Sequence, residues 1–115
     1  MGRRDELRLL QGTLDLLVLK ALEAGPRHGY GVAAWVRERT EGAIEIEDGA
    51  LYTSLHRMAR RGWVASQWGV SENNRKAKYY ELTGAGRRRL SAEVASWERY
   101  AHAMSRVVRS KEAST

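Results

Sequence analysis

Apolar side chains recur at helical spacing in the first part of the chain. Over Leu7–Ala24 they cover more than one side of a helix, which predicts a helix buried on several faces. Gly25 and Pro26 end this segment, because glycine favours the position after a helix and proline does not continue one. A second helix is predicted over Gly29–Thr40, with an apolar side formed by Val32, Ala33 and Val36.

The next segment changes from helical spacing to alternation and back. Ala43–Glu47 alternates apolar and acidic residues, as a short strand does. Leu51, Leu55 and Met58 then follow at i, i+4 and i+7, which predicts a third helix within the stretch GALYTSLHRMARRGWV. We expect Asp48 to cap its start, because an aspartate oxygen can accept hydrogen bonds from the first unpaired amides. The apolar stripe faces inward, which leaves on the other faces Ala50, Thr53, Ser54, Arg57 and Arg61.

The second half of the chain predicts a hairpin followed by a long helix. Trp63–Val70 and Lys78–Leu82 are rich in aromatic and β-branched residues, and the polar segment between them is basic. Thr83 is placed to cap a final helix that reaches about Arg109, since the intervening stretch contains no proline. Ser110–Thr115 is small, polar and terminal, and is expected to be a disordered tail. The predicted fold is therefore mainly α with a small β-hairpin.

The final helix also carries a regular apolar stripe. Its residues are spaced by 4, 3, 4, 3 and 4 positions, an average of 3.5, which is typical of a coiled-coil seam. Such a seam predicts a homodimer, although its first half could instead pack on its own domain. The predicted dimer interface consists of Leu90, Val94, Trp97, Ala101, Met104 and Val108.

Composition narrows the classes of function. The chain has 115 residues and a mass of 13.0 kDa, the size of one small domain. Its 20 Lys and Arg residues against 14 Asp and Glu residues give a net charge of +6, which fits a partner that is a polyanion but also fits a merely basic protein. No apolar run approaches the roughly 18–20 residues that cross a bilayer, and the first residues do not resemble a signal peptide, so we expect a cytoplasmic protein without membrane contact. The absence of cysteine excludes disulfides, zinc–thiolate sites and thiol nucleophiles.

Motifs for catalysis are weak. The histidines His28, His56 and His102 fall in different predicted elements without metal-ligand spacing, and no serine stands in a nucleophile-elbow motif. The stretch TGAGRRRL places two glycines between a strand and a helix, but arginine occupies the third glycine position of a dinucleotide-binding motif. We therefore predict no enzyme activity, no cofactor and no metal.

A nucleic-acid interface agrees with more of the sequence. The third helix has a small, polar, arginine-bearing outer face, which suits the major groove, where arginine can donate two hydrogen bonds to guanine. The basic hairpin tip suits phosphates or a minor groove, although such a tip can also serve only to protect a sheet edge. The expected contacts at the hairpin are Asn73, Asn74, Arg75, Lys76 and Lys78.

From about Leu10 to Trp97 the sequence resembles the PadR family of bacterial winged-helix regulators. The stretches that carry the resemblance are GTLDLLVLKAL, HGYGVA, GALYTSLHRMARRGWV, WGVSENNRKAKYYELTGAGRRRL and SWERY. It implies a winged helix-turn-helix domain over residues 1–83, in which the Asp48–Arg61 helix reads DNA and the Trp68–Leu82 hairpin is the wing, and a dimerisation helix over 84–109. Thr53 stands where many members have proline, which leaves the target sequence open. The implied DNA contacts are Ala50, Tyr52, Thr53, Ser54, Arg57 and Arg61 on the recognition helix, with His28 and Tyr30 beside the wing.

The resemblance also implies a ligand site at the dimer seam. In short PadR regulators the position of Trp97 lines a pore between the subunits and can stack on flat aromatic ligands. A tryptophan in a seam can equally be a packing anchor. The expected effector-binding residues are Leu9, Leu16, Glu93 and Trp97.

These observations together predict a homodimeric transcriptional repressor. We expect it to bind an inverted-repeat operator in double-stranded DNA while unliganded, and to be released by a small-molecule effector that is a planar aromatic compound. The alternative is a winged-helix protein–protein adaptor without specific DNA binding. The two differ in salt dependence, because DNA binding releases counterions and a mostly apolar interface does not.

Overall fold

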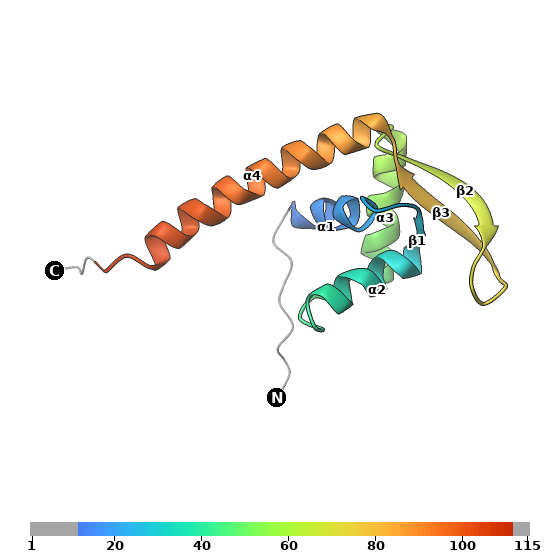
Figure 1. Ribbon diagram of the computed structural model, residues 1–115, viewed down its shortest axis with the longest axis horizontal. Helices are drawn as coiled ribbons and strands as arrows, with labels where there is room; N and C mark the ends of the chain where they lie inside the picture. Colours follow the sequence, from blue (N-terminus) through green and yellow to red (C-terminus); the bar gives the residue numbers. More distant parts are fainter. Residues whose placement is uncertain (1–11, 112–115) are drawn as a thin grey trace.

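The computed structural model describes residues 12–111, which form four helices and a small sheet (Figure 1). Helix α1 packs against each of the other three helices. The C-terminal half of α4 projects away from the rest of the described chain, on the side opposite the β2–β3 hairpin (Figure 1). In chain order the elements are α1 (Thr13–Ala21), β1 (Arg27–His28), α2 (Gly29–Arg39), α3 (Asp48–Arg60), β2 (Val64–Val70), β3 (Lys76–Leu82) and α4 (Gly84–Val108).

The helices predicted from apolar spacing are present. Helix α1 lies inside the range predicted for the first helix, whose residues 7–11 fall outside the described part of the chain. Thr83 caps α4 as predicted, because its Oγ1 accepts a hydrogen bond from the Gly86 amide at 3.0 Å. The prediction that Asp48 caps α3 is wrong. The Glu47 carbonyl already accepts from the Leu51 amide at 2.9 Å, so Glu47 is the N-cap and Asp48 is the first helical residue.

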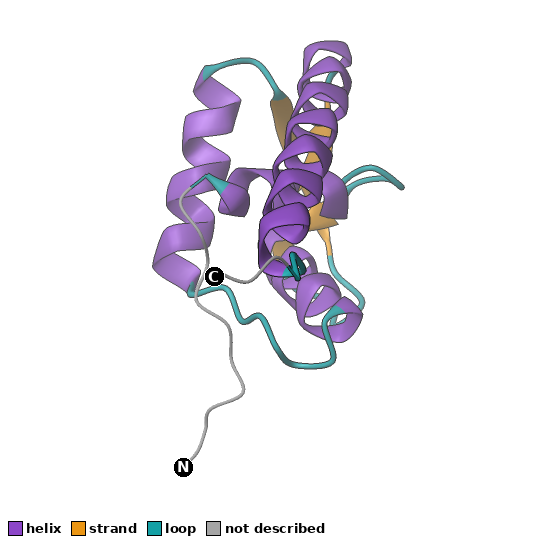
Figure 2. Ribbon diagram, turned by 90° about the vertical axis from the view of Figure 1, so that its left-hand side faces the viewer, coloured by secondary structure: helices purple, strands orange, loops and turns teal. Residues whose placement is uncertain are grey.

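The sheet has three antiparallel strands in the order β1-β3-β2 (Figure 1), and it lies behind α4 in the view of Figure 2. The hairpin pairs Val64 with Leu82 at its base and Val70 with Lys76 near its tip. The strand predicted over Ala43–Glu47 is wrong, and the third strand is instead β1, which pairs with Tyr79 and Tyr80 of β3. Ala43–Glu47 is a loop whose apolar and acidic residues alternate because its two isoleucines pack against the core. Its backbone pairs with no strand among the described residues.

The core lies where the helices meet the base of the hairpin. Its buried apolar side chains come from every helix and from β2 and β3, and they include Leu19, Val36, Leu55, Tyr80 and Leu90. Tyr80 is only 2% exposed, and burial raises the pKa of its hydroxyl above the ordinary value, with a smaller contribution from Tyr52. The core thereby joins α1, α2, α3, the start of α4 and the hairpin into one unit.

The start of α4 is held closely against the chain that leaves α3. The Thr83 amide donates to the Trp63 carbonyl at 3.0 Å, and the Thr83 hydroxyl donates to the Gly62 carbonyl at 2.7 Å. Gly86 is buried at this junction, and a Cβ there would lie 2.0 Å from the Trp63 carbonyl oxygen. Because that neighbour is backbone, only glycine fits without moving the hairpin or α4.

Gly86→Ala is therefore expected to destabilise the fold. Overpacking at this backbone contact should cost about 1–3 kcal/mol of unfolding free energy. Urea unfolding followed by circular dichroism measures it. Gly84→Ala is the matched control in the same turn, because a Cβ there meets only the end of the Arg88 side chain at 3.7 Å. Equal stability of the two variants would contradict the close contact.

Candidate nucleic-acid interface

Helix α3 has one buried face and one exposed face. Leu51, Ser54, Leu55 and Met58 are buried. Because a helix turns once in about 3.6 residues, the opposite face is centred on Thr53, which was predicted to face outward, and on side chains that were not predicted. The exposed residues of this outward face are Gly49, Thr53, His56 and Arg60.

The predicted outward position of Ser54 is wrong, because Ser54 is 0% exposed. Its hydroxyl donates to Asp15 Oδ1, in the first turn of α1, at 2.6 Å. The Arg57 side chain is 33% exposed, and its Nη2 donates to the same oxygen and forms an ion pair with Asp15. Ser54 and Arg57 are three residues apart and share one side of α3, so one carboxylate on α1 binds both.

Sequence reasoning missed His56 and Arg60. Both are exposed, and they lie on the far side of α3 from the buried stripe. The signal was present, since one and a half helical turns, about 5.4 residues, lead from Leu51 to His56 and from Leu55 to Arg60. Of the other predicted contacts on this helix, Ala50, Tyr52, Thr53 and Arg61 are exposed.

Tyr52 connects α3 to the start of α2. Its side chain lies against Gly29, where an added Cβ would be 2.5 Å from the tyrosine hydroxyl oxygen. His28, predicted to contact DNA, is the N-cap of α2, and its Nδ1 accepts from the Gly31 amide at 2.9 Å. Tyr30 is 72% exposed at the first turn of α2. The side chains at this end of α2 therefore border the same surface as α3.

The wing ends in a tight turn. The Asn74 amide donates to the Ser71 carbonyl, and the Ser71 amide donates to the Arg75 carbonyl, both at 2.8 Å. Asn74 has a φ of 60°, the left-handed conformation that asparagine tolerates better than most residues. Asn73, Arg75 and Lys76 are exposed at or beside this turn. The predicted tip is thus displayed to solvent, and Asn74 has a role in its backbone geometry.

A hollow of about 620 Å³ separates the outward side of α3 from the wing. Lys76 Nζ and Lys78 Nζ lie 5.2 Å and 5.9 Å from the centre of the Trp68 ring, which is itself 60% exposed. The lining combines aromatic and basic side chains with one acid, Glu72, whose Oε1 is 3.8 Å from His28 Nε2. Residues from α2, α3, β2 and β3 line it, among them Tyr30, Tyr52, His56, Trp68, Lys76 and Lys78.

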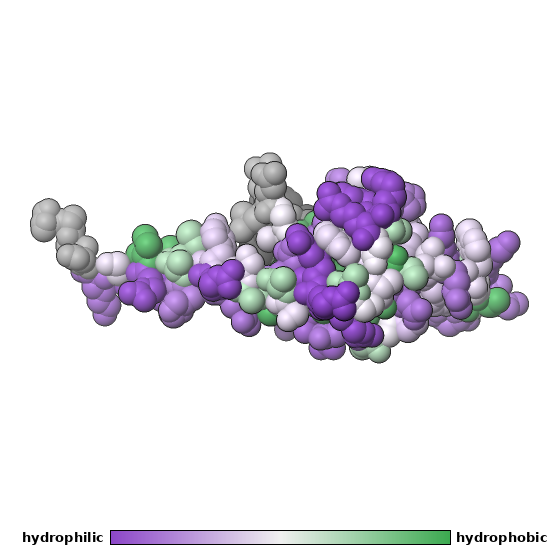
Figure 3. Space-filling model, turned by 90° about the horizontal axis from the view of Figure 1, so that it is seen from above, coloured by the Kyte–Doolittle hydropathy of each residue, from purple (hydrophilic) through white to green (hydrophobic). Residues whose placement is uncertain are grey.

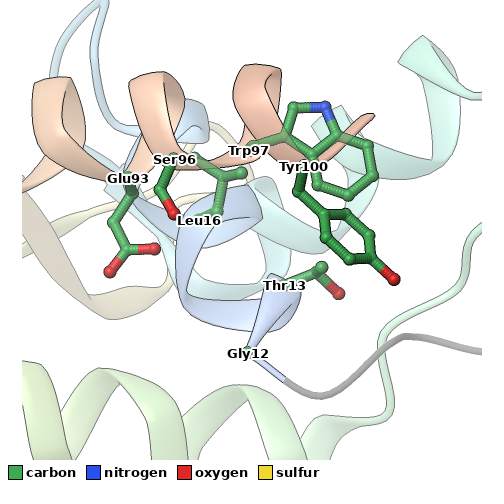
Figure 4. Close-up of a pocket in the computed structure, with 7 residues that line it drawn as sticks. All are labelled: Gly12, Thr13, Leu16, Glu93, Ser96, Trp97 and Tyr100. Carbon is green, nitrogen blue, oxygen red and sulfur yellow. The ribbon is translucent and has the colours of Figure 1, made fainter. Parts of the chain in front are cut away.

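A second hollow, of about 480 Å³, lies between α1 and α4 (Figure 4). Three of the predicted effector residues, Leu16, Glu93 and Trp97, line it, and Leu9 lies outside the described residues. Tyr100, which sequence reasoning missed, is its second large ring, 5.9 Å from Trp97 between centres. Glu93 Oε2 is paired with Arg89 Nη2 at 2.6 Å. We call this hollow the α1–α4 groove.

The apolar stripe of α4 divides into two parts. Leu90 is buried at 5% exposure in the core of its own domain, so its assignment to the dimer interface is wrong, and Val94 is partly buried against that core. The spacing could not distinguish the two parts, because both halves follow the same repeat. Beyond Val94 the large apolar side chains are exposed along one side of the projecting helix (Figure 3): Trp97, Tyr100, Met104, Val107 and Val108.

Other kinds of site are not found within residues 12–111. No group of three or more His, Cys, Asp or Glu side chains in this range could hold a metal ion. No helix in the described range is long and apolar enough to cross a membrane.

Comparison with known proteins identifies the relatives of this fold. The crystal structure of a PadR family transcription regulator from Clostridium difficile R20291 matches with a TM-score of 0.73 and 29% identity, over 84% of this chain and 99% of that chain. A PadR family transcriptional regulator from Eggerthella lenta matches with a TM-score of 0.73 and 29% identity, over 88% of this chain and 86% of that one. An uncharacterised protein from Lysinibacillus sphaericus is 27% identical over 89 residues, 77% of this chain and 82% of its own length.

The predicted fold class is confirmed by these structures. A PadR-like transcriptional regulator from Bacillus cereus shares the fold at 20% identity, with a TM-score of 0.76 over 89% of this chain and 97% of that chain. The family model described as Transcriptional regulator PadR-like family matches residues 18–92, which include α2, α3, the wing and the start of α4. The chain therefore belongs to the PadR-like family of transcriptional regulators.

Proposed function

We propose that the protein is a homodimeric repressor that binds an inverted-repeat operator and is released by a planar aromatic effector. PadR regulators bind DNA, and the family dimerises. The observation that carries the proposal is the outward face of α3, where Thr53, His56 and Arg60 are exposed beside a basic wing. A hydroxyl, an imidazole and a guanidinium can donate or accept hydrogen bonds at base edges in the major groove.

Base and backbone contacts are divided between the two elements. Arg60 can pair with guanine through two hydrogen bonds, and Thr53 and His56 read neighbouring bases. Arg75, Lys76 and Lys78 on the wing bind phosphates, with Trp68 between the two lysines as an apolar surface for the sugar. The helix then supplies the sequence preference, and the wing supplies affinity that is independent of sequence.

The exposed part of the α4 stripe is the proposed dimer interface. Its large apolar side chains are each 40% or more exposed, including Trp97 at 40% and Val107 at 75%. A continuous apolar stripe on a projecting helix is covered in solution by a partner, and a second copy of α4 has the matching surface. In such a dimer the two α3 helices must lie about 34–36 Å apart, one turn of DNA, to reach both half-sites.

The α1–α4 groove is the proposed effector site. Trp97 and Tyr100 supply two aromatic faces, and Leu16 an apolar wall (Figure 4). A planar aromatic compound can stack on such rings. Because Trp97 belongs to both the groove and the exposed stripe, a bound ligand touches the dimer interface and can change how the two subunits are oriented.

Trp97→Ala is expected to abolish the response to a planar aromatic dye while operator binding is retained. The substitution removes one of the two stacking faces but leaves α3 and the wing intact. Tryptophan fluorescence quenching by the dye, and the dye's effect on operator affinity, measure the response. Trp35→Phe is the matched control, because Trp35 packs on the core under Arg27 and Arg39, away from the groove. If the Trp97→Ala dimer dissociated without dye, the main role of Trp97 would be packing at the dimer interface, and the prediction would be wrong.

Selection of DNA fragments from a random pool by the purified protein tests the proposed function. Recovery of an inverted repeat would support both sequence preference and twofold symmetry. The selected duplex should bind with a steep dependence on salt concentration, because each neutralised phosphate releases counterions. A pool without enrichment, together with weak salt dependence, would favour the protein–protein adaptor instead.

A further inference from the structure

Polar contacts fasten the recognition helix to α1 at one carboxylate. The Ser54 hydroxyl and Arg57 Nη2, both on α3, donate hydrogen bonds to Asp15 Oδ1 on α1. Ser54 is fully buried, and the Arg57 and Asp15 side chains are 33% and 21% exposed. Asp15 therefore binds α3 at two points that are almost one turn apart along the helix.

These two contacts restrict a motion that apolar packing leaves open. The burial of Leu51, Leu55 and Met58 holds α3 against the core, but hydrophobic contact has no preferred direction. Hydrogen bonds require a narrow range of distance and angle. Rolling α3 about its own axis would separate Ser54 and Arg57 from Asp15, while much of the apolar contact would remain.

We propose that Asp15 is the positioning residue that sets the rotation of α3, and so decides which side chains meet the bases. The inference rests on the proposed DNA-binding function. At a side-chain radius of about 5–6 Å, a roll of about 20° moves a contacting atom by about 2 Å, which is enough to break a hydrogen bond to a base. Asp15 touches no DNA itself, and acts through the orientation of Thr53, His56 and Arg60.

Asp15→Asn in the full chain tests this role, because the variant keeps the size of the side chain and one acceptor oxygen but loses the charge that holds Arg57. Affinity for the duplex selected by the wild-type protein should fall at least about tenfold, the equivalent of one weakened base contact in each half-site. Affinity for a scrambled duplex of equal length should change by less than about twofold, because the wing's phosphate contacts remain.

Two further variants separate positioning from other effects. Asp15→Glu keeps the charge but lengthens the side chain, and should also lower the preference for the selected duplex. Glu23→Gln is the matched control, because it removes an ion pair with Lys20 at the other end of α1, remote from α3. It should change neither affinity.

A double-mutant cycle shows whether Asp15 acts through its two partners. In a background of Ser54→Ala with Arg57→Gln, the Asp15→Asn substitution should cause little additional loss of preference. An undiminished effect in that background would overturn the assignment, since Asp15 would then act by another route.

The remaining outcomes are also decisive. Equal losses of affinity for the selected and scrambled duplexes, or no loss for either, would overturn the inference. Unfolding of both the Asn and Glu variants, seen by circular dichroism at the assay temperature, would make Asp15 a stability contact and overturn it as well. Failure of the wild-type protein to prefer any sequence would overturn the proposed function itself, which is a distinguishable result.

Discussion

Replacing Met104 and Val108 with glutamate is expected to convert the protein to a monomer and to lower operator affinity by a factor of about 10²–10⁴. Both side chains are exposed on the α4 stripe, at 46% and 73%. Four carboxylates would then be brought together in one apolar interface, where charge is costly to bury. Sedimentation at micromolar concentration measures the assembly, and titration of the selected duplex measures the affinity.

The control for this prediction uses the opposite side of α4. Ala95→Glu with His102→Glu adds two carboxylates at exposed positions away from the stripe and should leave both the dimer and operator binding intact. These substitutions also spare the domain itself, because the core residues Leu90 and Val94 are unchanged. A wild-type chain that sediments as a monomer would show that the stripe does not join two copies.

Arg60→Ala is expected to cost about 1–3 kcal/mol of binding free energy per half-site and to relax the preference at one base-pair position in each. Arg60 lies on the outward face of α3, whereas Arg57, the arginine that the sequence predicts there, is paired with Asp15. Repeating the random-pool selection with the variant shows the relaxed position directly. Titration of the wild-type duplex gives the change in affinity.

The wing provides the contrast for Arg60. Arg75→Ala with Lys76→Ala should weaken binding to all sequences alike and reduce the log–log salt slope by about 0.9 for each phosphate that is no longer neutralised. If Arg60→Ala produced the same uniform weakening, Arg60 would bind a phosphate, and sequence preference would have to come from other residues on α3.

The fold was largely predictable because its helices follow strong periodic patterns. Apolar spacing and the Thr83 cap located α2, α3 and α4, and Gly25-Pro26 located the end of α1, to within a few residues of their observed bounds. The third strand was not predictable in the same way. Strand β1 has only two residues and exists because β3 lies beside it, and Ala43–Glu47 alternates like a strand without a neighbouring edge. Local pattern carries no information on which backbone lies alongside.

The candidate site was predictable as a surface but less well as a set of residues. To predict the basic residues of the wing as contacts, it was enough to know that they are exposed, and residues at the turn of a hairpin usually are. On α3 the prediction depended on which side chains faced inward, and Ser54 faces inward because Asp15 lies opposite it. That partner is separated by 39 positions in sequence, so helical spacing within α3 could not reveal it. In α4 the same apolar repeat runs through the buried and the exposed part, so spacing alone could not locate the boundary between them.

Two consecutive residues of helix α1 face different neighbours, one the α1–α4 groove and the other α3. Leu16 lines the α1–α4 groove, and Asp15 holds α3 through a hydrogen bond of 2.6 Å. The two residues are about 1.5 Å apart along the helix axis, so a ligand that displaced this turn of α1 by about 1 Å would also stretch the bond from Ser54 to Asp15. Ligand and operator would then oppose each other within one subunit, and each would weaken the other by the same factor. A dimer with a single ligand would lose one half-site while the other stayed engaged.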